Sequence, residues 1–379
     1  MKLRSYIIFF LLFGVLSDFY ITLVVLPSSQ LIWKFLVVLP SLPALICLLY
    51  IAAGKYYTES ITLFSYLIFI FEFPKFIFLL FSSAGRYILG IAHPTADWIA
   101  FGAGAAVSAF FCTLIFHVTT HLVVKEVEIS LKGLPEQFKG LRVCQLTDMH
   151  LGSFGKNINY IRRVVDTTLE LKPDLILFTG DLVNFDSREA LPYLDELSRL
   201  EAPLGIFAIR GNHDYLMHGY HHTPEGRELD KARVLEIERG LGWNVLLNSN
   251  AILTRNGAQL ALVGVENITS NPYLYADGGD LKKACDGLPD GIFKILLSHD
   301  PSHWRMEVVP CADIPLTLSG HTHGLKYKLI GLRPSTWKLP NYAGIYRQGE
   351  KILYVSEGLG SAFAFRLGGY PKIDIITLI

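Results

Sequence analysis

The chain has 379 residues, and its 34 Lys and Arg residues balance 34 Asp and Glu residues, so its formal net charge at pH 7 is zero. That balance argues against a nucleic-acid partner, which usually requires a basic surface that neutralises phosphates. Hydrophobic residues make up 51% of the chain, and its mean hydropathy is positive. These values exclude an ordinary soluble protein of this size, and almost all of the apolar excess lies before Val124.

Four apolar segments in the N-terminal third are long enough to cross the hydrocarbon core of a bilayer, which takes about 20 residues. They cover residues 6–26, 31–53, 61–81 and 98–123. The first could be a signal peptide, because Lys2 and Arg4 precede it, but no small-residue cleavage site is evident and three more spans follow. We therefore expect residues 1–123 to form a retained, multi-pass region of the inner or plasma membrane, in contact with membrane lipids.

Basic residues in the short loops predict the orientation of these spans. Those on one side are Lys2, Arg4, Lys55, Lys125 and Lys132. The opposite loops contribute Arg86, and Lys34 at the start of the second span reduces the difference in basic charge between the two sides. By the positive-inside rule, both termini and the C-terminal domain are expected in the cytoplasm.

Asp18, Glu72 and Lys75 are ionisable residues that lie within the apolar segments. Charged groups at such positions are costly and often functional. Glu72 and Lys75 are spaced to share one helical face, although Pro74 between them disturbs that geometry. Asp18 could pair between helices, so we favour a structural role for all three residues over a functional one.

Residues 124–379 form a second region in which short apolar runs alternate with amphipathic stretches. The expected strands cover residues 127–131, 141–146, 174–179, 206–209, 260–265, 292–297, 314–318, 352–355 and 373–378. Helical periodicity appears at residues 157–170 and 188–200. This pattern predicts an α/β domain with helices on the outer faces of its sheets.

Polar blocks directly follow five of the expected strands. The blocks are Asp148-Met149-His150, Gly180-Asp181, Gly211-Asn212-His213-Asp214, Ser298-His299-Asp300 and Gly320-His321-Thr322-His323. Loops at the carboxyl ends of strands in α/β sheets can converge on one site. A single block would be weak support, since Asp-x-His occurs by chance and an Asn turn can simply cap a helix. Five blocks that supply only oxygen and imidazole ligands are hard to explain by structure alone, and they predict a metal site.

In this order the blocks resemble the calcineurin-like metallophosphoesterase superfamily, whose pattern is D-x-H, GD, GNH[DE], H and GHxH. The resemblance covers residues 127–379 and implies a calcineurin-like α/β sandwich of two sheets flanked by helices. Residues 134–140, 148–152, 354–360 and 371–378 resemble the membrane-associated bacterial branch in particular. Members of that branch often have Gly-Gln after the last block, whereas Leu325 and Lys326 follow Gly324 here, which leaves the substrate subclass open.

The resemblance also implies a role for each site residue. One metal ion would be held by Asp148, His150, Asp181 and His323, and the other by Asp181, Asn212, His299 and His321. Asp181 would thus bridge the two ions. His213 would lie over the substrate phosphate as a catalytic residue, and Asp214 would orient it.

These residue types suit hydrolysis by two divalent metal ions. A bridging carboxylate allows two cations to lie about 3.5–4 Å apart and to lower the pKa of a shared water, so that a metal-bridging hydroxide can attack phosphorus. Carboxylates and imidazoles without a thiolate favour Mn²⁺, Fe or Zn²⁺. His213, when protonated, would assist the leaving oxygen.

The expected activity is therefore hydrolysis of a phosphodiester or pyrophosphate by a membrane-anchored enzyme. A lipid-linked phosphoester is one alternative for the substrate, by analogy with relatives that act beside a membrane. A different class of function is a membrane transporter or sensor with a metal-binding but non-catalytic phosphoesterase-like module. A protein phosphatase is a third hypothesis, although no peptide-docking segment is recognisable.

Overall fold

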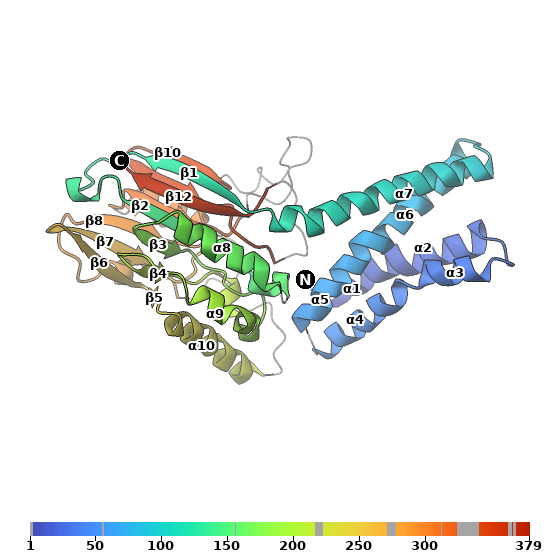
Figure 1. Cartoon of the computed structure of the whole chain (residues 1–379), viewed down its shortest axis with the longest axis horizontal. Coiled ribbons are helices and arrows are strands. Elements are labelled where there is room, and N and C mark those ends of the chain that lie inside the picture. The colour runs from blue at the N-terminus through green and yellow to red at the C-terminus, as the bar shows by residue number, and fades with distance from the viewer. Residues whose placement is uncertain are drawn as a thin grey trace. The chain divides into compact units, whose positions relative to one another are not determined.

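The computed structural model describes residues 3–54, 57–155, 157–216, 223–270, 278–311, 313–323, 341–362, 366 and 369–379. Its contacts separate an N-terminal unit that ends at Thr119 from a second unit that begins at Thr120 (Figure 1). Two of the loop lysines used to predict orientation, Lys2 and Lys55, lie outside the described residues.

The N-terminal unit contains four helices that are long and apolar enough to span a membrane. Within the described residues they cover Leu3–Val25, Leu31–Ala53, Tyr57–Ile88 and His93–Thr120. Their α-helical parts are α1 (Leu3–Phe9), α2 (Leu16–Tyr20), α3 (Leu31–Val38), α4 (Ser41–Ala53), α5 (Tyr57–Leu67), α6 (Phe73–Ser83) and α7 (His93–Phe116). All four expected spans are present, and the third, expected at residues 61–81, extends at both ends to Tyr57–Ile88.

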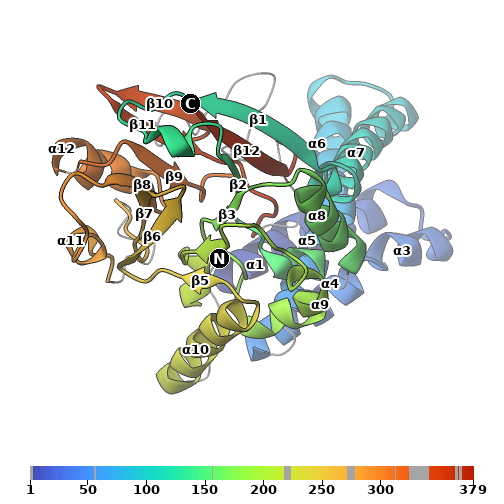
Figure 2. The same cartoon turned by 60° about the vertical axis from the view of Figure 1, so that its left-hand side comes forward.

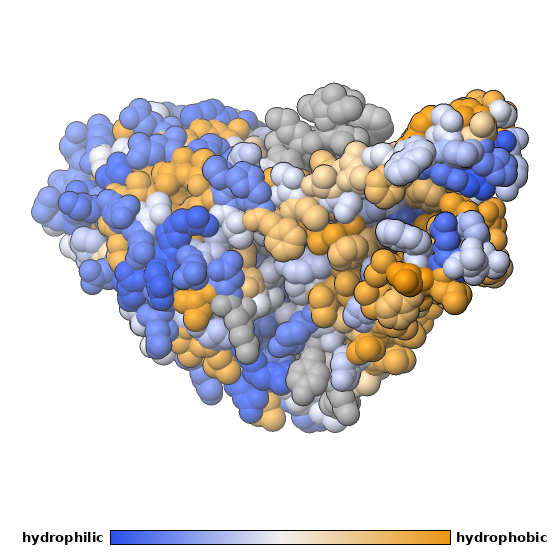
Figure 3. Space-filling model, turned by 45° about the vertical axis from the view of Figure 1, so that its right-hand side comes forward, coloured by the Kyte–Doolittle hydropathy of each residue, from blue (hydrophilic) through white to orange (hydrophobic). Residues whose placement is uncertain are grey.

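The outer surface of this unit is apolar. Large side chains such as Phe19, Ile32 and Phe101 are more than half exposed, and Figure 3 shows hydrophobic residues covering much of this unit's surface. In water such a surface would be unfavourable, but lipid tails solvate it without cost. The surface therefore agrees with a membrane-embedded bundle.

Asp18, Glu72 and Lys75 form one buried network in the spans. Lys75 Nζ lies 2.5 Å from Glu72 Oε2 and also pairs with Asp18. Ser41 donates its hydroxyl to Asp18 Oδ2 at 2.5 Å, and Lys75 donates to the Val37 carbonyl at 3.0 Å. Because these residues come from the first three spans, the network ties three helices together in a low-dielectric interior.

Loss of the lysine from this network should destabilise the membrane unit. Lys75→Ala leaves two carboxylates buried beside each other, and breaking a buried ion pair costs about 3–5 kcal/mol. We expect a clear fall in the thermal unfolding temperature in detergent, whereas Lys34→Ala, at a half-buried lysine of the second span, should have little effect. Adding Asp18→Asn and Glu72→Gln should restore stability, and equal melting of the two single variants would contradict the structural role.

Within the described residues, the second unit is built on two six-stranded sheets. The first sheet has the order β1 (Val123–Ile129), β12 (Lys372–Leu378), β2 (Arg142–Leu146), β3 (Leu175–Phe178), β4 (Ile206–Ala208) and β5 (Asn244–Val245). The second has the order β10 (Gly344–Gln348), β11 (Lys351–Val355), β9 (Leu316–Ser319), β8 (Phe293–Leu297), β7 (Ala258–Gly264) and β6 (Ser249–Arg255). The expected α/β sandwich of two sheets flanked by helices is confirmed.

Alternate residues of the central strands face different cores, as the two-residue period of a strand requires. Leu175 and Leu177 of β3 pack with residues of the second sheet, including Ile295, in the core between the sheets. Ile176 and Phe178 face the opposite side and pack with α8 (Ile158–Glu170). Burial on both faces explains why β3 is a continuous apolar run in the sequence.

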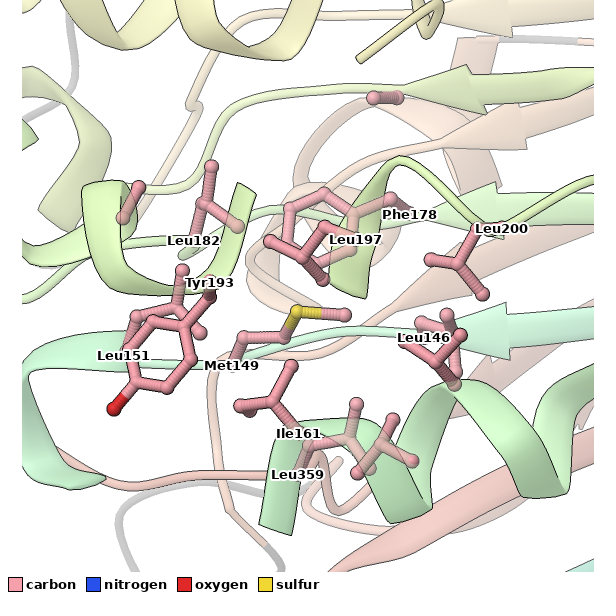
Figure 4. Close-up of a cluster of buried hydrophobic side chains, with 14 of the residues drawn as sticks. Leu146, Met149, Leu151, Ile161, Phe178, Leu182, Tyr193, Leu197, Leu200 and Leu359 are labelled. Carbon is pink, nitrogen blue, oxygen red and sulfur yellow. The ribbon is translucent and has the colours of Figure 1, made fainter. Parts of the chain in front are cut away.

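Helices cover the outer face of each sheet. The remaining helices are α9 (Leu194–Leu197) and α10 (Pro224–Gly240) near α8, and α11 (Leu281–Ala284) and α12 (Val309–Cys311) beside the second sheet (Figures 1 and 2). The cluster between the first sheet and its helices reaches into the loops beyond the strands, because it includes Met149, Leu151 and Leu182 (Figure 4). These residues alternate with the polar residues of the first two blocks, so the core anchors both loops.

Candidate metal centre

The five polar blocks lie at the carboxyl ends of neighbouring parallel strands. Strands β2, β3 and β4 are parallel in the first sheet, and β8 and β9 are parallel in the second. The two sheets are joined at this edge, since the His321 amide donates to Asp148 Oδ2 at 2.9 Å. The topology therefore brings blocks that are up to 175 positions apart in the chain, from Asp148 to His323, to one place.

Carboxylate and imidazole groups converge there in three overlapping groups. They are Asp148 with His150 and His323, His150 with Asp181 and His213, and Asp181 with His299 and His321. Within each group, the candidate ligand atoms all lie within 4.8 Å of one another. Among the described residues, the structure thus assembles all six of the expected Asp and His ligands together with His213.

Asp181 occupies the centre of this arrangement. Its Oδ2 lies 3.1 Å from His299 Nε2 and 3.5 Å from His150 Nε2. On the side of His150, Asp148 Oδ1 lies 3.5 Å from His323 Nε2. One carboxylate oxygen between imidazoles from two different sheets is the geometry expected of a ligand shared by two cations.

Asn212 completes the expected ligand set. Its side chain is 1% exposed, and its Oδ1 has no hydrogen-bond partner within the described part of the chain. A buried amide oxygen without a partner is costly unless a bound group, such as a cation, interacts with it. The adjacent His213 amide donates to Asp181 Oδ1 at 2.9 Å, which places Asn212 beside the central carboxylate. This oxygen therefore fits a cation that Asp181 also contacts.

Five of the expected ligands have left-handed backbone conformations. The φ angles are 51° at Asp148, 47° at His150, 61° at Asp181, 69° at His321 and 49° at His323. Such conformations are unfavourable for residues other than glycine and persist where the surrounding structure enforces them. Their concentration in these blocks indicates that backbone strain is used to aim ligand side chains at one point.

Two glycines make room for the ligands. A Cβ atom added at Gly211 would lie 2.2 Å from Asp181 Oδ1 and 2.7 Å from His299 Cε1, and one at Gly320 would lie 2.3 Å from Asp148 Oδ2. These separations are far shorter than van der Waals contact, so the ligand carboxylates occupy the space that a side chain would need.

Gly211→Ala should therefore displace the central carboxylate. Overpacking of this kind costs about 1–3 kcal/mol, so we expect the affinity for Mn²⁺ to fall tenfold or more. The matched control is Gly240→Ala, since a Cβ atom there meets no atom within 4 Å. Calorimetric titration of both variants checks this, and unchanged affinity in Gly211→Ala would show that Asp181 does not contact the cation.

The charges in the centre are strongly coupled. Burial alone would raise the pKa of Asp181, but the imidazoles of His299 and His213 hold it well below its usual range. Conversely, burial would lower the pKa of His299, but the Asp181 carboxylate raises it to about 10. In the absence of a cation, a proton on His299 therefore neutralises Asp181.

A cation must displace that proton, so metal binding should depend on pH. Below a ligand's pKa the proton competes with the metal, and affinity rises about tenfold per pH unit for each proton displaced. We expect the dissociation constant for Mn²⁺ to fall steadily as pH rises from about 6 to 8, with protons released in the titration. Equilibrium dialysis at several pH values measures this, and an affinity independent of pH would contradict the coupling.

His213 and Asp214 have different surroundings. His213 Nδ1 lies 2.8 Å from the Asn184 carbonyl oxygen, and its ring meets His150 edge to face at 4.8 Å. Asp214 is fully buried and accepts backbone N–H groups from Asp181 at 2.7 Å, Leu182 at 2.8 Å and Gly211 at 2.9 Å. The carboxylate thus holds the loop that carries Asp181, while the Asn184 carbonyl orients the His213 ring.

Further groups position the ligands, and the sequence gives a signal for only some of them. Thr179 contributes a carbonyl oxygen 2.7 Å from His299 Nδ1, and Thr147 donates its hydroxyl to Asp148 Oδ2 at 2.8 Å. Carbonyl groups carry no sequence signal, because every residue has one. Asp300, whose Oδ2 lies 3.6 Å from His321 Nε2, has a signal, because it directly follows His299 in the fourth block. Leu325 and Lys326 lie outside the described residues.

The fold and the centre together define a class of protein: a two-sheet α/β sandwich with a site suited to a pair of divalent cations. A family model described as calcineurin-like phosphoesterase matches residues 141–325.

Several relatives are named as metallophosphoesterases or phosphodiesterases. A "Transmembrane protein with metallophosphoesterase domain" from Danio rerio is 31% identical over 67% of this chain and 57% of its own length. The "Uncharacterized metallophosphoesterase YkuE" of Bacillus subtilis is 30% identical over 68% of this chain and 86% of its own length. The "Phosphodiesterase YaeI" of Escherichia coli is 29% identical over 63% of this chain and 82% of its own length. The chain thus covers little more than half of the zebrafish relative.

The chain belongs to the calcineurin-like metallophosphoesterase family, as the sequence blocks predicted. The names of the family and of its members support the expected class of enzyme, a metal-dependent phosphoesterase. Bacterial and transmembrane relatives together with four apolar helices also support a membrane protein.

Proposed function

We propose that the chain hydrolyses a phosphodiester or a pyrophosphate with two divalent cations at the centre described above, and that residues 1–123 anchor the catalytic domain, residues 124–379, to a membrane. The observation that carries this proposal is the position of Asp181 Oδ2 between His299 and His150, at 3.1 and 3.5 Å. A site for one cation would not need a shared carboxylate at its centre.

The groups of ligand atoms support a division between two ions. Asp148, His150 and His323 form one group and Asp181, His299 and His321 another. Asp181 would also contact the first ion, and Asn212 the second. Carboxylate, amide and imidazole ligands without a thiolate suit Mn²⁺, Fe or Zn²⁺.

When bound, the two ions would lower the pKa of a shared water and neutralise charge on the phosphate oxygens. His213 would give a proton to the leaving oxygen. The Asn184 carbonyl lies 2.8 Å from Nδ1 and can only accept a hydrogen bond, so Nδ1 would keep its proton and donate it to this bond. Nε2 would then transfer the proton to the substrate. Asp214 would hold Asp181 and the two residues after it in place through their amides.

The substrate class is tested with the full chain in detergent micelles. Rates with Mn²⁺ are compared for a chromogenic phosphodiester, the matching phosphomonoester and a lipid pyrophosphate, each with and without chelator. We expect turnover of the diester or the pyrophosphate above the monoester, lost on chelation. A preference for the lipid ester would support a lipid-linked substrate, whereas bound metal without turnover of any ester would favour the non-catalytic module of a transporter or sensor.

The proposal also includes a cytoplasmic position for the catalytic domain at an inner or plasma membrane. Support comes from the loop charges. Arg86, which counts against this orientation, lies at the end of the third helix and pairs with Asp97 Oδ1 at 3.0 Å, so it adds little net charge there. A fluorescent reporter fused after Ile379 should be bright, and alkaline phosphatase at the same position inactive. The reverse result would place the domain outside the cytoplasm.

A further inference from the structure

The membrane unit contains a cavity of about 720 Å³ among its four spans. Its walls come from the first span near Ile21, the second near Val37, the third near Lys75 and the fourth near Ala105. The volume lies within the roughly 300–1,000 Å³ that is typical of small-molecule sites. Figure 1 shows the α2–α3 and α6–α7 hairpins separating toward their loops, where the cavity lies.

The charged groups and the serine hydroxyl along the cavity are already paired. Lys75 is neutralised by Asp18 and Glu72, and the Ser108 hydroxyl donates to the Ile70 carbonyl at 2.8 Å. Asp97 accepts hydrogen bonds from Ser82 and Arg86. The rest of the wall is dominated by apolar side chains, so the cavity offers its occupant mainly apolar contact.

The dimensions of the wall match one leaflet of a bilayer. Trp33 and Trp98 line the cavity close to the starts of α3 and α7 and are 60% and 73% exposed. Exposed tryptophans near helix ends favour the headgroup level of a membrane. From Trp98 to Ser108 the lining of α7 rises by about 15 Å at 1.5 Å per residue, which is about half of a 30 Å hydrocarbon core.

We propose that this cavity binds one acyl chain of a membrane phospholipid, with the headgroup at the level of Trp33 and Trp98 and the chain end toward Lys75. Lipid tails surround the unit, and a mainly apolar cavity open to them offers few polar partners to hold water. The Lys75 network limits the depth of the site, because its charged groups exclude an acyl chain from the centre of the bundle. This lipid site is separate from the metal centre and does not depend on hydrolysis.

Photolabelling tests the proposal. The full chain is reconstituted in phosphatidylethanolamine and phosphatidylglycerol vesicles that contain a trace of phospholipid with a diazirine in its acyl chain. After irradiation, we expect labelled peptides to include residues 101–108 of α7. A parallel sample with a diazirine fatty acid distinguishes the two sources of an acyl chain, and preferential labelling by the fatty acid would overturn the phospholipid as the ligand.

Neighbouring alanines of α7 provide the matched variants. Ala105 is exposed and lines the cavity, whereas Ala106 is exposed but does not line it. Ala105→Trp fills the cavity and should reduce labelling severalfold, while Ala106→Trp should leave it unchanged. Circular dichroism and metal-dependent hydrolysis verify that both variants are folded. Equal labelling of the two variants would show that the lipid is only part of the surrounding bilayer.

Discussion

Replacing Asp181 with alanine should reduce metal-dependent hydrolysis more than about 10³-fold, equivalent to roughly 4 kcal/mol of transition-state stabilisation. The physical reason is that Asp181 Oδ2 faces imidazoles of both proposed metal positions. We expect the variant to lose at least one cation per chain, as measured by elemental analysis after dialysis. Asp181→Asn should behave similarly, because an amide has no charge to bridge two cations.

The control for this variant is Asp195→Ala, which removes an exposed carboxylate in the first turn of α9. It should keep both the metal content and the rate. Asp181→Ala that retained two ions and full turnover would show that another group bridges the centre.

Replacing His213 with glutamine should separate catalysis from metal binding. His213 is assigned to proton transfer, which contributes about 10²–10⁴-fold to a rate, so we expect the metal content to stay and turnover to fall within that range. The loss should be largest for alkyl leaving groups, which need a proton, and small for nitrophenolate, which does not. Rates for a series of diesters of increasing leaving-group pKa measure this dependence.

An exposed histidine of the same unit, His121, serves as the control, and His121→Gln should leave the series unchanged. A uniform loss across all leaving groups in His213→Gln, together with loss of metal, would instead assign His213 as a ligand. That assignment is a real alternative, since His213 lies in one of the three groups of candidate ligand atoms.

Strand ends and their polar blocks could be predicted from the sequence because each signal is local. The strands expected at residues 141–146 and 174–179 are found at Arg142–Leu146 and Leu175–Phe178. Buried strands read as continuous apolar runs, and the blocks directly follow them. The convergence of those blocks also followed from the rule on the carboxyl ends of parallel strands.

Helix α10 escaped prediction because its buried face is not apolar. Its buried residues are Asp230, Val234 and Glu238, spaced four apart as a helix requires, but two of the three are acids. Asp230 accepts the Ser187 hydroxyl, and Glu238 faces Arg210 at 3.2 Å. Periodicity of apolar residues finds only helices that bury apolar stripes.

Short edge strands and backbone contacts were missed for related reasons. Strand β5 is two residues long, and its Asn244 is exposed, so it lacks an apolar run. The position of the Asn184 carbonyl that faces His213 depends on how the chain turns after Val183, and no residue type predicts that turn. The sequence indicated that Asp18 could pair between helices, but it did not identify Lys75 as the partner, because the pairing of helices is a tertiary property.

The most direct test of the account is a titration of the metal-free full chain with Mn²⁺ while phosphodiester hydrolysis and bound metal are measured together. A shared carboxylate between two groups of ligands predicts that activity reaches its plateau at two ions per chain and is lost on chelation. A plateau at one ion, or hydrolysis that persists without metal, would contradict the binuclear centre.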